Sequence, residues 1–322
     1  MLKIFNTPYF RKRYNFEDRN SFLFCYLCIF FPFAFFCVFF VYVNFDQIIQ
    51  AFNVQGQFGF ENFGEVFQEF GPNYDRGWNL WEVEWKSIQL YLIGWLFWFP
   101  GTVSNYVLFK KIWGHYVFRA IFMIPNVLGG IVTVLIYKYM VNVNGPLFLL
   151  AQEIFGELPQ KAQLSGLLGA EETAWTTLLA LRFLPHLVGF NLVQTGAYAR
   201  IPTELNEVGR IDGLGFLGEF FRIALPLTWS TMSIGIITGV AGALLGDCGV
   251  FLYTKGGANT ATMGFYLYWQ TYLVSGQGNA SLAHDDAYGF PAALGLLMTA
   301  ILVPLSLGTR KLCSSVIEDV TY

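Results

Sequence analysis

The chain has 322 residues, of which 55% are hydrophobic, 19% aromatic and 13% charged; its formal net charge is −3 and its mean hydropathy is +0.47. Because a soluble domain has about 25% charged residues, this composition argues against a soluble protein and indicates an integral membrane protein. The net charge says little about function, since the placement of Lys and Arg matters more than their sum in a membrane protein.

Several segments are long and apolar enough to span a membrane, which needs about 20 mostly apolar residues for a hydrocarbon core about 30 Å thick. In chain order they are, to within a few residues, 21–43, 87–109, 119–141, 173–199, 223–246 and 287–308. The first is too long for a signal peptide and lacks a cleavage pattern of small residues. We therefore predict an all-α membrane protein of about six helices: a segment 1–20, one membrane domain 21–309 and a tail 310–322.

Lys and Arg are distributed unevenly around these spans if residues 1–20 are cytoplasmic. The cytoplasmic side then holds Lys3, Arg11, Lys12, Arg13, Arg19, Lys110, Lys111, Arg119, Arg200, Arg210, Arg222, Arg310 and Lys311. The outer side holds Arg76, Lys86, Lys138, Lys161 and Lys255, and Arg182 lies within the fourth span. Since cytoplasmic loops carry the excess of basic residues, both termini and the loop 200–222 are predicted to be cytoplasmic. Residues 44–86 are predicted to form an external segment.

The sequence offers little to a catalytic interpretation. Its histidines show no HExxH spacing, and it has neither a GxSxG elbow nor a GxxxxGK[ST] phosphate loop. Cys25 and Cys28 form a lone CxxC pair in an apolar run, and we interpret them as apolar helix side chains because a zinc site would need two further ligands. We expect no metal and no cofactor on this chain. If the protein uses ATP, the nucleotide must be bound by another subunit.

Polar residues inside the spans are candidates for a solute pathway, because charges within a membrane are costly. Arg182 and His186 are four residues apart, so they share a face of the fourth helix, and Asn191 follows in the same segment. Such a face would line a path for a hydroxylated or anionic solute. Alternatively, Arg182 snorkels or pairs with a carboxylate of a neighbouring subunit. Asp247, after the fifth span, either faces the path near its outer mouth or marks a helix end in water.

The loop between the fourth and fifth spans has its own pattern, IPTELNEVGRIDGLGFLGEFFRIALPL, at residues 201–227. Thr203 is suited to an N-cap, with acidic residues in the first turns of a short helix. Gly213 and Gly215 are expected to end that helix in a turn before the next one begins. An ordinary amphipathic helix at the membrane interface is the alternative interpretation of the same periodicity.

The spacing within this loop resembles the EAA loop of binding-protein-dependent ABC importer permeases. Glu207-Val208-Gly209 stands at the EAA position, Gly213 follows after three residues, and Ile223-Ala224-Leu225-Pro226 matches I-x-L-P after nine more. The sequence departs from the pattern at Val208 and Gly209, where two alanines are usual. RIDG at residues 210–213 and IPTEL at 201–205 are similar to the carbohydrate branch of the family. The resemblance covers about residues 87–311.

The resemblance implies a type I importer architecture in which this loop is a coupling helix docked on a cytoplasmic ATPase. Coupling would involve Glu207, Arg210, Asp212 and Gly213, followed by Ile223, Leu225 and Pro226 of the motif. The expected partners are a second permease subunit, a paralogue of this one, two ATPase subunits that bind ATP and Mg, and an extracytoplasmic solute-binding protein. No nucleic acid is expected.

The same resemblance implies a carbohydrate as substrate, an oligosaccharide and, given Arg182, one that could be acidic, carried across a bacterial plasma membrane. The predicted path residues are Arg182, His186, Asn191 and Asp247. An ABC permease for peptides, polyamines or ions, driven by the same kind of ATPase, is the alternative within this family. From other classes, a membrane-embedded enzyme acting on lipid or polysaccharide and a structural or sensor subunit remain alternatives. The enzyme would turn over without ATP, and the structural subunit would tolerate destruction of the loop.

Overall fold

The structure is a computed structural model that describes residues 19–72, 78–110, 113–188, 192–247, 249–274 and 288–316. These residues are mostly helical, with one two-stranded hairpin, β1 (Asn53–Val54) and β2 (Gln57–Phe58). The first half contains α2 (Arg19–Phe36), η1 (Cys37–Tyr42), α3 (Val43–Phe52), α4 (Glu61–Glu69), α5 (Leu80–Phe109), α6 (His115–Val127), α7 (Gly130–Val141), α8 (Pro146–Phe155) and α9 (Gln160–Ser165). The second half contains α10 (Glu171–Val188), α11 (Leu192–Tyr198), α12 (Thr203–Ile211), α13 (Phe216–Glu219), η2 (Phe220–Ala224), α14 (Leu225–Leu245), α15 (Val250–Tyr253), α16 (Met263–Val274) and α17 (Gly289–Val316).

Within the described residues, four helices are long and apolar enough to cross a membrane: Phe24–Phe52, Leu80–Phe109, Phe216–Leu245 and Gly289–Val316. They correspond to the first, second, fifth and sixth predicted spans. A helix satisfies its backbone hydrogen bonds internally, as lipid requires. All four extend beyond their predicted limits at one end. The first continues to Phe52, and α5 already starts at Leu80, where the Asn79 side chain accepts hydrogen bonds from the backbone N–H groups of Trp81 and Glu82.

The third and fourth predicted spans are divided into shorter helices. Leu128 and Gly129 separate α6 from α7, which begins at Gly130; glycine is a residue type that weakens helices. A second bend of 42° joins α7 to α8, and counting this pair as one span raises the number of candidates to five. The fourth predicted span consists of α10 and α11, with residues 189–191 outside the described part. Length and composition therefore give four or five spans where the sequence predicts six.

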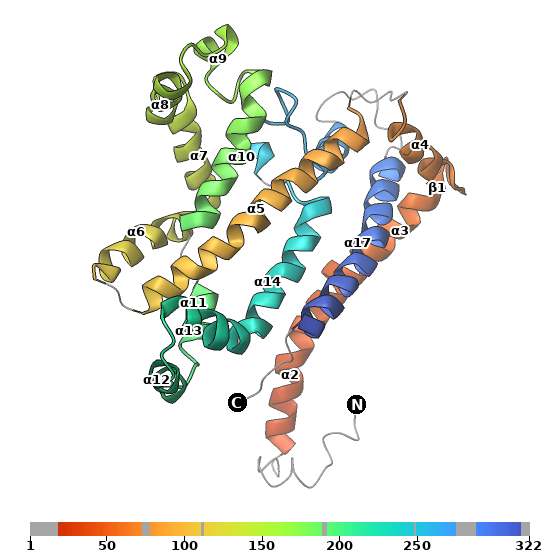
Figure 1. Cartoon of the computed structure of the whole chain (residues 1–322). Helices are drawn as coiled ribbons and strands as arrows, with labels where there is room; N and C mark the ends of the chain where they lie inside the picture. The colour runs from red at the N-terminus through yellow and green to blue at the C-terminus, as the bar shows by residue number, and fades with distance from the viewer. Residues whose placement is uncertain are drawn as a thin grey trace.

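Helix α5 is the central element and contacts α10, α11 and α14. Hydrogen bonds between side chains reinforce these contacts. Trp175 Nε1 on α10 donates to Gln89 Oε1 at 3.0 Å, and Asn105 Nδ2 donates to Gln194 Oε1 of α11 at 3.1 Å. Figure 1 shows α5 running diagonally through the molecule, with α14 beside it and α17 paired with α3. Because buried polar groups need partners, these bonds fix how α10 and α11 lie against α5.

The two ends of the helical body carry different elements. Figure 1 shows α12 and the start of α2 at one end, and α4, the hairpin, α8 and α9 at the opposite end. The predicted alternating topology requires this arrangement, with the loop 200–222 on the same side as the start of the first span. Which of the two sides is cytoplasmic stays a prediction.

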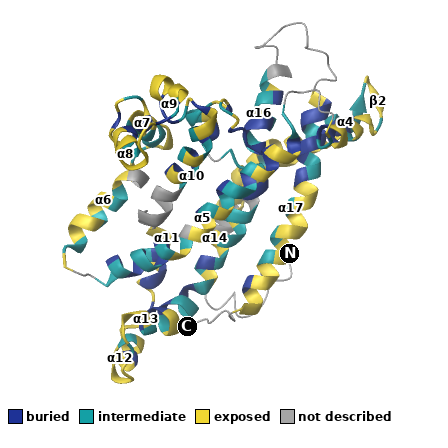
Figure 2. Cartoon of the chain, turned by 45° about the horizontal axis from the view of Figure 1, so that its top comes forward, coloured by how far each residue is buried: buried dark blue, intermediate teal, exposed yellow. Residues whose placement is uncertain are grey.

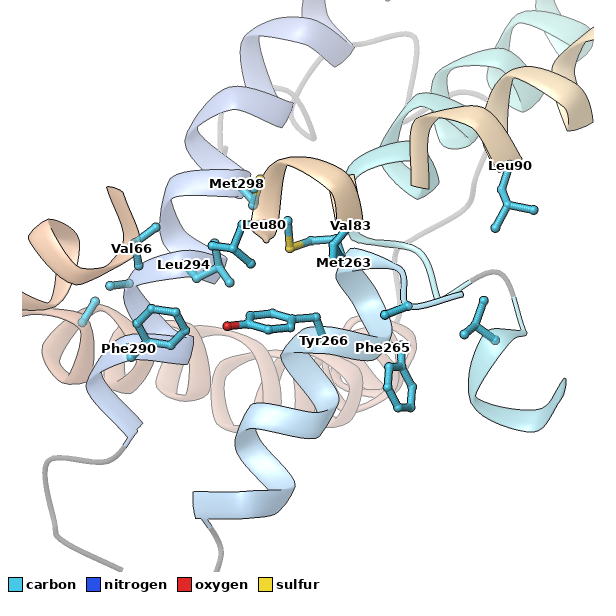
Figure 3. Packing of buried hydrophobic residues seen from close by; sticks show 14 of the residues in the cluster. Val66, Leu80, Val83, Leu90, Met263, Phe265, Tyr266, Phe290, Leu294 and Met298 are labelled. Carbon is cyan, nitrogen blue, oxygen red and sulfur yellow. The ribbon is translucent and has the colours of Figure 1, made fainter. Parts of the chain in front are cut away.

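The main hydrophobic core lies towards the end that holds α4. Figure 3 shows Val66 of α4, Leu80 of α5, Tyr266 of α16 and Leu294 of α17 meeting in one cluster, and all four are 0% exposed. The predicted external segment 44–86 therefore contributes α4 to the core. Elsewhere large apolar side chains are exposed, as on the outer helices of Figure 2 and throughout the Phe-rich α2. A surface of this kind suits lipid as its solvent.

Candidate functional site

Helix α12 is a short rigid element with defined ends. Pro202 occupies the N-cap position and makes no side-chain capping bond, so the prediction that Thr203 is the cap is wrong; Thr203 is the first helical residue. At the other end Gly213 has φ +75°, the left-handed conformation that glycine adopts without cost. Leu214 N–H donates to the Gly209 carbonyl at 2.9 Å, and Gly213 N–H to that of Arg210 at 3.1 Å. This pair of bonds is a Schellman motif, which confirms the predicted glycine turn.

The predicted coupling residues divide into an exposed and a packed group. Glu207, Arg210, Asp212 and Gly213 are all exposed on α12 or directly after it. Ile223, Leu225 and Pro226 lie partly buried where the chain enters α14, and Pro226 stands in the first turn, where its missing N–H has no helical partner to lose. The charged half of the motif is thus presented to the surroundings, and the I-x-L-P half anchors it.

Apolar side chains accompany these charges on α12. Val208 is 52% exposed and Ile211 84% exposed, and the two are three residues apart, so they are neighbours on the helix surface. Figure 2 shows α12 largely exposed. An exposed apolar and charged face on a projecting helix is a surface suited to a partner protein.

Gly209 is buried, in contrast to its neighbours. A Cβ atom at this position would lie 2.7 Å from Ile223 Cδ1 and 3.4 Å from Leu214 Cδ1. Glycine therefore lets α12 pack closely against η2 and the residue that follows the turn. The departure from the family pattern at Gly209 is accordingly a packing feature. The sequence carried no signal for it beyond the absence of alanine.

An ion pair ties this region to the central helix. The Lys110 ammonium group, at the C-cap of α5, pairs with the Glu219 carboxylate at the end of α13, and the side chains are 17% and 8% exposed. Lys110 Nζ also lies 5.5 Å from the centre of the Tyr106 ring. A buried pair depends on both partners, since either charge alone would be costly. Sequence reasoning does not find this contact, because Lys110 and Glu219 are 109 residues apart in the chain.

A groove of about 700 Å³ lies between α5, α7, α10, α14 and α15. Tyr91, Trp95 and Trp98 line it from α5, where spacings of four and three residues place them on one face. Tyr137 of α7 and Tyr253 of α15 add two more rings. The volume falls within the usual range of ligand pockets, and aromatic faces with hydroxyl groups can contact a sugar.

Helix α14 lines the groove with a row of glycines, Gly235, Gly239 and Gly242, and Gly246 at its C-cap follows. The spacing of four and three residues keeps the first three on one helix face, and their small size leaves the groove open along the helix. At Gly239 an added Cβ would lie 3.1 Å from Tyr91 Cε2, so this glycine also gives the ring its place.

Of the four predicted path residues, the structure places Arg182 in the groove. Its Nε is buried and has no hydrogen-bond partner. The positive charge of Arg182 also opposes the effect of burial on Tyr253, which raises the pKa of that phenol to about 12 with a further contribution from Tyr137. The side chain of His186 and the whole of Asn191 lie outside the described residues.

Asp247 does not line the groove. Its carboxylate accepts hydrogen bonds from Gly249 N–H at 3.1 Å and from Phe251 N–H at 3.1 Å, and so caps the short helix α15. Burial raises the pKa of this carboxyl above 3.8, and the two backbone bonds oppose the rise. The carboxylate thus lies at the start of a helix and is partly buried there, and a role for Asp247 in the solute path stays a prediction.

Comparison with known proteins identifies relatives of the chain, although no family model matches it. The "Probable ABC transporter permease protein YurN" of Bacillus subtilis is 25% identical over 66% of this chain and 70% of its own length. The maltodextrin transport system permease protein MdxF of B. subtilis is 26% identical over 77% of this chain, which spans 57% of MdxF. The multiple sugar-binding transport system permease protein MsmF of Streptococcus mutans is 26% identical over 66% of this chain and 68% of its own length.

A solved structure shares the fold. A bacterial ABC transporter involved in the import of the acidic polysaccharide alginate aligns with a TM-score of 0.69 at 17% identity, over 93% of this chain and 98% of the transporter chain. In sequence and in fold the chain thus resembles the permease subunits of ABC transporters. Its long apolar helices and these relatives support a multi-pass membrane protein, as the apolar segments predicted, and the alternative of a membrane-embedded enzyme is not favoured.

Proposed function

We propose that this permease carries a carbohydrate, an oligosaccharide, through a bacterial plasma membrane as one subunit of an ATP-driven importer. Two of the three relatives above are named for maltodextrin or multiple-sugar transport, which supports this substrate class. The proposed complex contains a second, paralogous permease subunit and two ATPase subunits that bind ATP and Mg. An extracytoplasmic binding protein delivers the sugar, as a solved alginate transporter in complex with a sugar-bound periplasmic protein supports.

The observation that carries the proposal is the geometry of α12. The helix projects at one end of the body, with Glu207, Arg210 and Ile211 exposed. The sequence of the chain contains no GxxxxGK[ST] nucleotide-binding loop. A separate ATPase can bind such a face. The Schellman turn and the close packing at Gly209 hold α12 against η2, which leads into α14, and the Lys110–Glu219 pair holds the neighbouring α13 against α5. Force applied to α12 would reach both helices.

Helix α14 connects the two candidate sites. Its first turn follows the η2 segment against which α12 packs, and its glycine face lines the groove. A displacement of α12 by the ATPase would therefore move a wall of the groove. In this proposal α12 is the coupling element and the groove is the part of the sugar path that this subunit supplies.

The apolar part of the α12 surface provides a test. The tagged chain is purified in mild detergent from its native membranes, and ATP hydrolysis and ATP-driven oligosaccharide uptake are measured after reconstitution. The double variant Val208→Asp with Ile211→Asp is expected to lose both activities and the associated ATPase while keeping its own expression. Leu164→Asp is the control, because Leu164 is 85% exposed on α9 at the opposite end. Full activity of the double variant would contradict the proposal.

A further inference from the structure

The charge distribution of the groove differs from that expected for a neutral ligand. Among the groove-lining residues that the structure describes, Arg182 is the one with a charged side chain. Facing it are rings, glycines and the hydroxyl groups of Thr133, Thr238 and Tyr137, with no carboxylate among them. The groove as described therefore carries an uncompensated positive charge.

The guanidinium group of Arg182 needs hydrogen-bond acceptors and a compensating negative charge. A guanidinium group stays protonated in proteins and has five N–H donors in a planar fork. The Nε donor is buried without a partner, and an arginine within a membrane segment is costly unless something compensates its charge. The arrangement that satisfies the fork best is a carboxylate bound in the groove through two parallel hydrogen bonds.

The surroundings of Arg182 specify the rest of the ligand. Trp95 and Trp98 on α5 offer flat apolar faces, and Tyr253 adds a ring near the guanidinium group. Sugar rings present C–H faces to such rings and hydroxyl groups at their edges. The glycine row on α14 leaves space beside them. Flat faces, hydroxyl partners and one fixed cation together match a carbohydrate that bears carboxylates.

We infer that the groove binds an acidic oligosaccharide, a chain containing uronic acid residues, and that Arg182 determines this specificity by pairing with a sugar carboxylate. The inference rests on the proposed function, since it names the substrate class of that same path. It assigns Arg182 a contact with the substrate. A carboxylate of the second permease subunit is the competing partner for Arg182, and the experiment below separates the two.

The test measures equilibrium binding to the whole reconstituted importer in nanodiscs. The probes are fluorescently labelled trimannuronate and trigalacturonate, each compared with its carboxyl-reduced, neutral form. At least one oligouronate is expected to bind about tenfold more tightly than its neutral form. Arg182→Gln should remove that preference and leave the affinity for the neutral form within about threefold, whereas Arg182→Lys should keep part of it, because Lys supplies the charge without the fork.

A second variant keeps the test decisive if Arg182→Gln fails to assemble. Thr238 is exposed and lines the same groove from α14. Thr238→Asp places a negative charge opposite the ligand with Arg182 intact, and Thr238→Asn is its matched neutral control. Thr238→Asp should weaken oligouronate binding by about tenfold relative to Thr238→Asn, and more so at low salt.

The inference is overturned if neither oligouronate binds more tightly than its neutral form, or if Arg182→Gln and Thr238→Asp change both ligands equally. Equal loss for both ligands is also the outcome expected if Arg182 pairs with the second permease. Failure of the proposed function gives a different result: no tested oligosaccharide, acidic or neutral, would then be taken up with ATP hydrolysis.

Discussion

A single backbone conformation at Gly213 sets the end of α12. Its φ of +75° lies in the left-handed region, which costs an L-residue about 1–2 kcal/mol. Gly213→Ala is therefore expected to lower the unfolding free energy by about that amount and to reduce ATP-driven uptake, because α12 would no longer be held in place. Gly213→Asn is the control, since asparagine tolerates this conformation better. Thermal unfolding and uptake of the complete importer measure both effects, and an alanine variant equal to wild type would contradict the assignment.

Gly209 and Ile223 are expected to be coupled. The methyl group of Gly209→Ala would approach Ile223 Cδ1 to 2.7 Å, and Ile223→Val removes that atom. Because Ile223→Val removes this clash, the double variant should unfold at a higher temperature than Gly209→Ala alone. A double-mutant cycle should give a favourable coupling energy of about 1 kcal/mol. Simple additivity of the two changes would show that α12 and η2 are not in the close contact described.

Asp247 provides a prediction about pH. Burial raises the pKa of its carboxyl above 3.8 in the folded state, so the folded protein holds this proton more tightly than the unfolded one does. Stability should therefore fall as pH rises from about 3.8 through the raised folded pKa. Asp247→Asn lacks this dependence but keeps an acceptor oxygen, and Asp247→Ala should lose the cap at a cost of about 1 kcal/mol. Parallel pH profiles for wild type and Asp247→Asn, in thermal unfolding, would contradict the burial of this carboxyl.

Residue types at the functional positions were predictable to different degrees. The exposed charges of α12 and the turn at Gly213 follow from a fixed spacing of polar residues and glycine within one loop. Arg182 was a candidate because a charge inside an apolar segment is conspicuous. The rings that surround Arg182, such as Trp95 and Tyr253, were not predictable. Aromatic residues are common throughout this chain, and only the packing of α5 against α10 and α14 and of α15 against α7 brings these rings to the groove.

At the scale of elements, the Lys110–Glu219 pair joins α13 to α5, beside the ring contact between Tyr106 and Phe216. Glu219→Ala leaves the Lys110 charge buried without its partner, which should destabilise the protein by about 3–5 kcal/mol and lower uptake. The double variant Lys110→Met with Glu219→Leu should recover most of the stability, because apolar residues of similar size replace buried pairs well. Thermal unfolding of the purified complex measures this. A double variant as unstable as Glu219→Ala alone would show that the loss has another origin.

Long uninterrupted apolar segments predicted the long helices well. Apolar segments interrupted by glycines or turns did not predict where one helix ends and the next begins. The helices α5, α14 and α17 follow from length and hydropathy. The first span extends past residue 43 because Gln47 and its neighbours pack near Gly295 of α17, a tertiary contact that no local pattern reveals. The breaks between α6 and α7 and between α7 and α8 depend on single glycines and turns, which tertiary context can either tolerate in one helix or use to divide it.

At the scale of the whole molecule, two features far apart in sequence share helices α5 and α14. The groove lies between α5 and α14, and the α12 region lies at one end of the same two helices. There Lys110 of α5 pairs with Glu219, and Gly209 of α12 packs against Ile223, just before α14. The class of protein was predictable from one loop and from the absence of a nucleotide motif in the sequence. The groove was not, because it is formed by helices separated by most of the chain.

The central claim is that α12 binds a separate ATPase, and cross-linking tests it most directly. In a cysteine-free background of the complete importer, Ile211→Cys places a thiol on the exposed face of α12, and Leu164→Cys places one on α9. With a short bifunctional thiol–amine cross-linker, the Ile211→Cys variant is expected to form a covalent adduct with the ATPase subunit, and the Leu164→Cys variant none. An adduct from Leu164→Cys with none from Ile211→Cys would contradict the account.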